Sequence, residues 1–535
     1  MLAETLAARG FAALRFDYYG TGDSALDSVR EDIAERWLDS VNEALAYLQD
    51  LSPHRPAVIA LRAGALIAGQ IAIPLGPVIL WDPISNGRAF VREQRALYSM
   101  TVNAHHNDSA NGARTTDTAI EEVVEDPDTV ALIGTSYADT AAKKLAELRL
   151  SPTDAPIATR WLVAPRRGRR DPHLAHFCEA TAAEHLEVDG MVEFVQPCGY
   201  VVRIPGEAIQ TLASWLDRVT PTDTMPIDPR YVEQAVFEEG RGITVIERIE
   251  FLGPNRLFAI RSQPADDTID RTTRTALFFG TANDTHHGPN REWVTLSRLA
   301  AAAGACAVRF DRRGVGETAK VKLDESTAIY SAEAIEDAFD AAAAAAPPSN
   351  LLAAGVCSGS WFSAQLGRTA KASAVVLINV ILWSWRNKHD CADNDQMLPA
   401  DFGLLRTDPA FQRSFRGRFK SFLSKYMPYR SWLWLGRFGV TQVPEVLLRP
   451  LLQKGIRVSV ILAPFDADWF RTQRGPESLQ RLDAPLRVIR TDAGDHTAYH
   501  PAVRAAVRSE VLSWCKQESA EVSTSARQSM PEAHL

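Results

Sequence analysis

The chain has 535 residues, more than a single hydrophobic core usually holds, so we expect at least two domains. Hydrophobic residues make up 46% of the sequence and charged residues 23%, which is typical of a soluble globular protein. The formal net charge of −8, without a Lys/Arg stripe among aromatics, argues against nucleic-acid binding, and no apolar run is long enough to span a bilayer.

The cysteines of the chain point to a reducing compartment. They stand at positions 178, 198, 306, 357, 391 and 515 and include no C-x-x-C pair, so they do not make a disulfide framework. We therefore expect a cytoplasmic protein in which a free thiol survives. The opening residues, MLAETLAARG, lack the apolar core of a signal peptide. No metal set with convincing spacing occurs, and we expect neither a metal nor a cofactor.

The first half alternates predicted helices and strands. Residues 1–9 predict a helix, and residues 11–16 (FAALRF) predict a buried strand. A long helical stretch covers residues 31–50, and two further strands are predicted at 57–61 and 77–82. Strands that alternate with helices favour a parallel, doubly wound sheet.

The second half repeats this order. Residues 299–317 (LAAAAGACAVRFDRRGVGE) match residues 6–23 (LAARGFAALRFDYYGTGD), so that Asp311 follows Asp17 by 294 residues. A second pair of matching positions, described below, is separated by 295 residues, which indicates an internal duplication. We predict two tandem α/β domains with mostly parallel, doubly wound sheets, at 1–225 and 226–518. The polar tail 519–535 is expected to be disordered.

A candidate nucleophile lies within residues 351–362, LLAAGVCSGSWF, which read as a strand, a tight turn and the start of a helix. Gly355, Cys357 and Gly359 alternate across the turn in the pattern of a nucleophile elbow, where the neighbours of the nucleophile must be small. The following helix directs its positive end at Cys357, which favours a thiolate or an oxyanion there. A buried structural cysteine is the alternative interpretation.

The matching position in the first half, 295 residues earlier, is Arg62, which cannot attack a carbonyl. No histidine base occurs between residues 192 and 219 of that half. We therefore predict that the first half is not catalytic.

Partners for Cys357 follow two later predicted strands. Asp466 comes just after the strand at 458–462, with Asp468 as the alternative, and His496 follows the last strand, 486–490. The order nucleophile, acid, histidine predicts a triad in which Asp466 orients His496 as the general base.

An acyl-transfer site also needs donors for the oxyanion and a pocket. The predicted strand at 275–280 ends beside Thr281 and Ala282, so we expect one donor there and the other at the N–H of Ser358. Residues 383–450 predict a helical lid, whose basic run either contacts an acidic carrier protein or forms a solvated helix face. Further pocket candidates, with solvated loops or core packing as alternatives, are His286, His287, Asp468, Trp383 and Trp385.

The second half resembles the α/β-hydrolase superfamily, and within it the serine-aminopeptidase-like bacterial hydrolases, over most of residues 240–515. The motifs that carry this resemblance are HGPNR at 287–291, VRFD at 308–311, GVCSG at 355–359, LIN at 377–379 and DHT at 495–497. The first half, with LRAGA at 61–65 and LWDP at 80–83, resembles a related group in which arginine replaces the elbow serine. Cysteine at 357 is similar to the nucleophile of dienelactone-hydrolase-like enzymes and of some cysteine thioesterases.

These features predict a cysteine-dependent acyl hydrolase or thioesterase that acts on an ester, thioester or amide through a thioester intermediate. An acyltransferase or cyclase of natural-product or polysaccharide biosynthesis is the first alternative, and a non-catalytic binding or scaffold protein is the second. The expected partner is a small-molecule acyl substrate, free or bound to an acyl carrier or a peptide, with neither nucleic acid nor membrane. A homodimer is left open.

Overall fold

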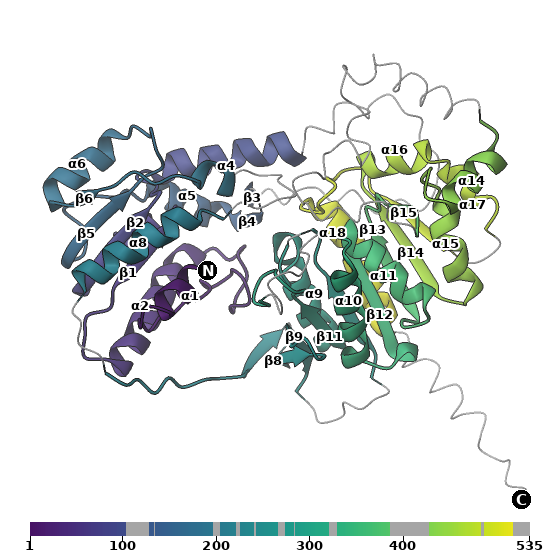
Figure 1. Ribbon diagram of the computed structural model, residues 1–535, viewed down its shortest axis with the longest axis horizontal. Helices are drawn as coiled ribbons and strands as arrows, with labels where there is room; N and C mark the ends of the chain where they lie inside the picture. Colours follow the sequence, from purple (N-terminus) through teal and green to yellow (C-terminus); the bar gives the residue numbers. More distant parts are fainter. Residues whose placement is uncertain are drawn as a thin grey trace, which may run out of the picture. The chain divides into compact units, whose positions relative to one another are not determined.

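The computed structural model of the chain separates into two compact units (Figure 1). The first unit contains the described residues of Met1–Met100 and Glu125–Tyr231, and the second contains Thr101, Val102 and the described residues from Val232 onward. The described residues are 1–102, 128–132, 134–195, 204–220, 225–239, 242–265, 273–282, 284–319, 329–385, 427–482 and 486–516. Residues 386–426 of the expected lid and the expected disordered tail 519–535 lie outside them.

The second unit is built on a nine-stranded sheet with the strand order β15-β14-β13-β12-β10-β11-β9-β8-β7. From β15 to β11 the neighbouring strands are parallel, whereas β9 is antiparallel to β11 and β7, β8 and β9 form an antiparallel meander. This order, with β10 between β11 and β12, is that of the α/β-hydrolase fold, so the expected fold class of this half is confirmed. The strands are β7 (Gln234–Glu239), β8 (Ile243–Leu252), β9 (Leu257–Pro264), β10 (Thr275–Phe279), β11 (Cys306–Phe310), β12 (Leu351–Val356), β13 (Ala374–Ile378), β14 (Arg457–Leu462) and β15 (Leu486–Arg490).

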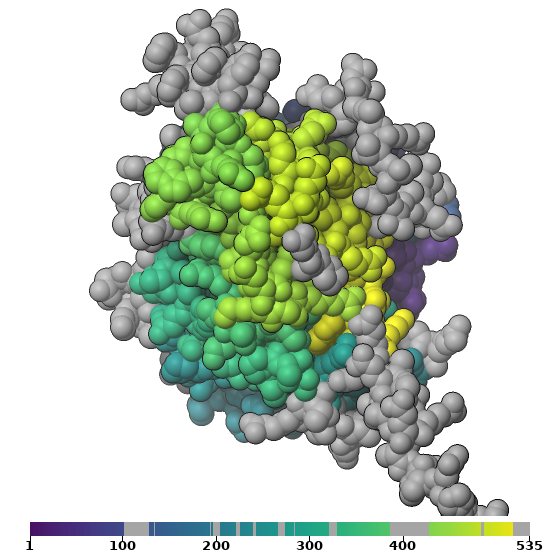
Figure 2. Space-filling model, turned by 90° about the vertical axis from the view of Figure 1, so that its right-hand side faces the viewer, coloured from purple at the N-terminus to yellow at the C-terminus, as the bar shows by residue number. Residues whose placement is uncertain are grey.

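Helices cover the sheet of the second unit in two groups. Helices α9 (Glu292–Ala302) and α18 (Pro501–Lys516) contact each other, and α11 (Ser358–Arg368) contacts both α10 (Ala332–Ala345) and α15 (Pro444–Gln453). All residues of β12 and β13 are buried, as expected for central parallel strands with a helix layer on each face. Helix α15 also contacts α14 (Tyr429–Arg437) and α17 (Gly475–Leu479), and Figure 2 shows this light-green to yellow part of the chain on the outer surface. The remaining elements are η1 (Pro289–Arg291), η2 (Pro348–Asn350) and α16 (Pro464–Thr472).

The first unit has a smaller, wholly parallel sheet of four strands in the order β1-β2-β5-β6. A separate two-stranded hairpin, β3-β4, accompanies it. The elements are α1 (Leu2–Ala7), α2 (Ile33–Leu51), β1 (Val58–Leu61), α3 (Gly64–Ala68), β2 (Leu75–Trp81), α4 (Gly87–Val102), β3 (Thr129–Leu132), β4 (Thr135–Ala138), α5 (Asp139–Glu147), β5 (Ala158–Ala164), α6 (Pro172–Thr181), β6 (Glu184–His185), α7 (Met191–Phe194) and α8 (Gly206–Val219). In the part of the chain that the structure describes, no helix combines the length and apolarity needed to cross a membrane.

The buried strand expected at residues 11–16 does not form, so this prediction was wrong. The segment has no regular structure, and Leu14 and Phe16 are 40% and 39% exposed. The matching strand of the second unit, β11, is held by pairing with β10 on one side and β9 on the other. The described part of the first unit offers neither partner, and a single strand without a neighbour leaves its backbone groups without ladder hydrogen bonds.

A turn just after these matching segments has the same geometry in both units. The Asp17 carboxylate accepts a hydrogen bond from the N–H of Asp23 at 3.0 Å, and that of Asp311 accepts one from the N–H of Glu317 at 2.9 Å. The residue before each donor is a glycine with positive φ, and a Cβ there would collide with the aspartate. Two sequence matches 294 residues apart therefore fold into the same local structure.

Candidate active site

Cys357 lies in a strained turn between β12 and α11. Its backbone angles are φ 55° and ψ −110°, a conformation that residues other than glycine rarely adopt. Its N–H donates a hydrogen bond to the Ile378 carbonyl oxygen at 2.9 Å. A Cβ at Gly355 would lie 2.6 Å from the Gly359 carbonyl oxygen, and a Cβ at Gly359 would lie 2.9 Å from the Phe279 carbonyl oxygen. The two glycines are thus required for the turn, as in a nucleophile elbow.

The two serines that follow Cys357, Ser358 and Ser360, are engaged in structural hydrogen bonds. Ser360 is fully buried, and its Oγ lies 2.6 Å from the Gly355 carbonyl oxygen and 2.7 Å from that of Ile378. The N–H of Ile378 donates to the same Oγ, so Ser360 joins β12 to β13. Ser358 Oγ accepts a hydrogen bond from the N–H of Ala282 at 2.9 Å. Neither hydroxyl is placed as a free nucleophile.

His496 and Asp466 meet directly. Nδ1 of the imidazole lies 2.7 Å from Oδ1 of Asp466, whose side chain is fully buried in the first turn of α16. Because an ionised carboxylate only accepts hydrogen bonds, Nδ1 carries the hydrogen and Nε2 is left to act as a base. Nε2 is buried and makes no hydrogen bond with any described residue.

The charges around His496 favour its protonated form. Burial lowers the pKa of the imidazole, but the negative charges of Asp466 and of the Cys357 thiolate outweigh it and raise the pKa well above its ordinary value. Nε2 itself has no hydrogen-bond partner among the described residues. Catalytic hydrogen bonds are commonly loose without substrate and tighten when it binds.

Asn379 is a site residue that the sequence reasoning used only as part of a motif. It is fully buried, directly after β13, with φ 51°. Its Nδ2 donates to the carbonyl oxygens of His496 at 2.8 Å and Asp495 at 3.0 Å, while its Oδ1 accepts from the N–H of Ala463 at 2.8 Å. Asn379 therefore ties the histidine loop to the start of the helix that carries Asp466.

Three backbone N–H groups were expected as candidate oxyanion donors, those of Thr281, Ala282 and Ser358. The N–H of Ala282 is occupied by Ser358 Oγ, which makes Ala282 the poorer of the two donors proposed at this loop. The N–H of Thr281 makes no hydrogen bond with a described residue. Ser358 is the first residue of α11, so its N–H has no acceptor within the helix. Thr281 and Ser358 are thus the available pair.

Of the two adjacent histidines predicted for the pocket, His286 is buried and His287 is partly exposed. His286 is 2% exposed, and its Nδ1 and backbone N–H each lie 2.7 Å from a carboxylate oxygen of Asp311. His287 Nδ1 lies 2.6 Å from Thr285 Oγ1. Both rings therefore fasten the loop that follows the oxyanion residues.

The other three pocket candidates have structural partners. Trp383 is fully buried and packs edge-on against Phe470, with ring centroids 5.5 Å apart. The indole N–H of Trp385 donates to the Val446 carbonyl at 2.6 Å. Asp468, the alternative acid, is exposed and accepts a hydrogen bond from Arg471 at 2.8 Å, so its partner is not His496.

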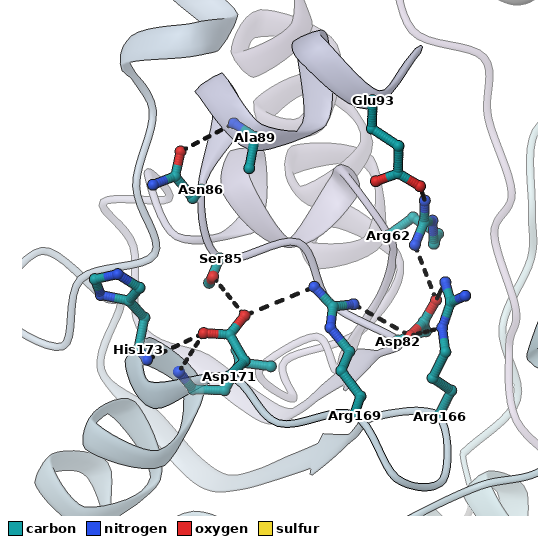
Figure 3. A network of polar contacts seen from close by, with 11 residues as sticks. Arg62, Asp82, Ser85, Asn86, Ala89, Glu93, Arg166, Arg169, Asp171 and His173 are labelled. Atoms are coloured by element: carbon teal, nitrogen blue, oxygen red, sulfur yellow. Dashed lines mark hydrogen bonds and ion pairs between the residues drawn. The ribbon is translucent and has the colours of Figure 1, made fainter. Parts of the chain in front are cut away.

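The first unit repeats the elbow without the nucleophile. Arg62 has φ 53°, and its N–H donates to the Trp81 carbonyl at 3.0 Å, as that of Cys357 does to Ile378. Its guanidinium points to Asp82, which follows β2 as Asn379 follows β13 (Figure 3).

No protein-family model matches the chain, and no curated protein is similar enough to match it. Among solved structures, it is similar to a thermostable esterase from Pseudomonas putida, with 17% identity, TM-score 0.30, and coverage of 53% of this chain and 84% of the esterase. A dienelactone hydrolase from Anabaena variabilis has 11% identity, TM-score 0.32 and coverage of 53% and 97%. A carboxyl esterase from Tuber melanosporum has 15% identity, TM-score 0.30 and coverage of 57% and 97%.

Proposed function

We propose that the chain, whose second unit has the α/β-hydrolase fold, is a cysteine-dependent acyl hydrolase that cleaves an ester, thioester or amide. The observation that carries this proposal is the combination of Cys357 in a strained elbow with a buried His496–Asp466 pair at 2.7 Å. A structural cysteine needs neither the unusual backbone conformation nor a histidine oriented by a carboxylate.

The mechanism follows from the positions of these groups. His496 Nε2 takes the thiol proton of Cys357, and the sulfur attacks the substrate carbonyl carbon. The N–H groups of Thr281 and Ser358 hold the resulting oxyanion, and removal of one such donor typically costs about 3 kcal/mol of transition-state stabilisation. The leaving group departs with the proton from His496 and leaves a thioester on Cys357. Water, deprotonated by His496, then attacks the thioester and releases the free acid and the thiol.

We further infer that the first unit is a degenerate copy of the second. The shared Asp–Gly turn, the shared elbow conformation at Arg62 and the four parallel strands in the same succession support this inference. Since arginine replaces the nucleophile, the chemistry is assigned to the second unit alone.

The test is the mass of the intact protein after brief exposure to a short acyl thioester. We expect the wild type to gain one acyl group, and Cys357→Ala to gain none. Cys178→Ala is the matched control, because Cys178 is a free, partly exposed cysteine of the first unit, and this variant should still be acylated. Acylation of Cys357→Ala equal to that of the wild type would refute the proposal.

The decay of the adduct then distinguishes hydrolysis from transfer. Loss of the acyl group in water, with release of free acid, supports a hydrolase. An adduct that persists in water and disappears only when an amine or alcohol is added would assign the site to acyl transfer instead.

A further inference from the structure

The first unit contains a cavity of about 380 Å³ at the carboxyl end of its parallel sheet. Arg62 directly follows β1, and Arg166 lies two residues beyond β5. Open α/β sheets usually bind their ligands at this edge, and the volume falls within the range of about 300–1,000 Å³ typical of small-molecule sites. The cavity is lined by Arg62, Glu93, Arg166, Arg167, Gly168 and Arg169.

One buried carboxylate organises the arginines of this cavity (Figure 3). Asp82 is fully buried, and Arg166 binds both of its oxygens, at 2.9 and 2.6 Å. Arg62 donates to Asp82 at 3.1 Å and Arg169 at 3.3 Å. Burial raises the pKa of Asp82, but its hydrogen bond with Arg166 and the three positive charges lower it overall, so the carboxylate stays ionised. Arg62, Arg166 and Arg169, here called the arginine cluster, thus share one buried carboxylate.

Three further acids lie near the arginine cluster, and two of them form ion pairs with its members. Asp189 forms a two-point ion pair with Arg167, at 2.8 Å for each bond, so these two charges cancel each other. Asp171 accepts hydrogen bonds from Ser85 and from the first N–H groups of α6, and its carboxylate also lies 3.6 Å from the Arg169 guanidinium (Figure 3). Glu93 lies 3.7 Å from Arg62 and is half-exposed. Within the described part of this unit, Glu93 is the acid of the cavity wall that opposes an incoming anion.

The arginine cluster also has unused hydrogen-bond donors. A guanidinium carries five N–H donors, whereas Asp82 engages two nitrogen atoms of Arg166 and one each of Arg62 and Arg169. The remaining groups reach the cavity from two segments of the chain, the turn after β1 and the loop between β5 and α6. A planar carboxylate is satisfied by one bidentate arginine, but a tetrahedral oxyanion accepts from several directions at once.

We propose that this cavity binds the phosphate group of a small phosphorylated molecule. The arginine cluster holds the phosphate oxygens, and the rest of the volume accommodates the organic part of the ligand. The proposal concerns a binding function of the first unit and does not depend on the activity proposed for Cys357.

The register of the two sheets shows how this site relates to the catalytic one. In the first unit Ala164 of β5 pairs with Trp81 of β2, and in the second unit Ile461 of β14 pairs with Ile378 of β13. Each residue of the second pair stands 297 positions after its counterpart in the first. Beyond these strands the two units differ, because Asp466 lies in the first turn of α16 whereas Arg169 lies in the loop before α6. The elbow nucleophile of the second unit corresponds to Arg62 in the first, which converts a catalytic position into a cationic one.

The test is calorimetric titration of the full chain at low ionic strength with glycerol 3-phosphate, inorganic phosphate and acetate. We expect glycerol 3-phosphate to bind at least as tightly as inorganic phosphate, and both to bind much more tightly than acetate. Arg169→Gln should weaken binding of the ester about tenfold or more, because it removes a charge-assisted hydrogen bond. Glu93→Gln should strengthen binding, because it removes the opposing charge.

Arg218→Gln is the matched control, since Arg218 is an exposed arginine of the same unit whose partner is Glu184 at 2.8 Å. It should bind the ester like the wild type. Equal affinity of the wild type, Arg169→Gln and Glu93→Gln for the ester would overturn the proposal, as would acetate binding as tight as that of phosphate. If Arg169→Gln does not fold, the increase in affinity for the ester expected of Glu93→Gln, at a half-exposed position, still tests the proposal. Binding of free phosphate without the ester would also contradict a site for a phosphorylated molecule.

Discussion

Asp466 and Asp468 are two residues apart, yet only one of them can serve His496. Successive residues of an α-helix are about 100° apart around its axis, so side chains two positions apart point about 200° away from each other. Asp466 therefore faces the core from the first turn of α16, while Asp468 faces solvent and binds Arg471. The sequence left both acids open because the start of this helix was not predicted.

Asp466→Asn should lower the rate constant of the acylation step by about 10²-fold or more, the usual contribution of an oriented general base. It should also shift the limb of the pH–rate profile governed by His496 to lower pH. The Asp466 carboxylate raises the pKa of the imidazole, so its removal lowers that pKa. The measurement is kcat/KM against pH, with Asp468→Asn as the control that keeps the wild-type profile. A profile that does not move in Asp466→Asn would contradict the assigned role.

Asn379→Ala should impair the site through His496 rather than through substrate binding. The variant loses the three hydrogen bonds that join the histidine loop to the start of α16, and we expect a loss of about 1–3 kcal/mol in the free energy of unfolding. Because His496 is held less firmly, kcat should fall with little change in KM. Steady-state kinetics beside thermal unfolding check this, and a fall in stability with unchanged kcat would make Asn379 purely structural.

Several positions of the candidate site could be predicted from the sequence because they depend on local sequence patterns. The elbow glycines, Cys357 and His496 follow strands whose apolar runs are plain in the sequence. The bond from Ala282 to Ser358 Oγ and those of Asn379 join segments far apart in the chain. Such contacts depend on how strands are ordered in the sheet, which periodicity alone does not reveal.

At the level of the elements, β11 and residues 11–16 show how tertiary context decides a strand. Their sequences are closely similar, but β11 lies between two partners and residues 11–16 have none among the described residues. The sequence pattern measures how well a segment suits a sheet. Whether the segment becomes a strand depends on the neighbours that the rest of the chain supplies.

The meander of the second unit is joined to its core by a buried charge network. Glu247 on β8 accepts hydrogen bonds from Arg298 at 2.9 Å, Arg309 at 3.0 Å and Ser262 at 2.7 Å. Burial raises the pKa of Glu247, but the two arginine charges lower it below its ordinary value overall. A carboxyl with a lowered folded-state pKa adds stability above its unfolded pKa, and that stability is lost as pH falls through the folded pKa.

Glu247→Gln should therefore lower the free energy of unfolding by about 3–5 kcal/mol near neutral pH, because it leaves two buried arginines without their anion. The difference from the wild type should shrink in acid. Chemical denaturation at several pH values measures this. Glu184→Gln, which breaks the exposed pair with Arg218, should cost less than about 1 kcal/mol. An equal loss in the free energy of unfolding for Glu247→Gln and Glu184→Gln would show that the network is not important for stability.

At the scale of the whole molecule, the two units differ in more than one catalytic position. Arg62→Cys in a Cys357→Ala background places a thiol at the elbow of the first unit, but no described histidine ring of that unit is paired with a carboxylate as His496 is with Asp466. We expect no acyl adduct in the mass of this double variant under the conditions that acylate the wild type. An adduct on the introduced thiol would mean that the first unit keeps a working site.

The parallel sheet of the first unit ends at β1, which pairs only with β2 among the described strands, whereas its counterpart β12 has a partner on each side. The outer side of β1 thus presents backbone N–H and C=O groups without a ladder. At the opposite end the sheet stops at β6, which is only two residues long and offers little to a neighbour. Unpaired edges of this kind are usually kept short in natural sheets, and β1 at four residues and β6 at two both fit that pattern.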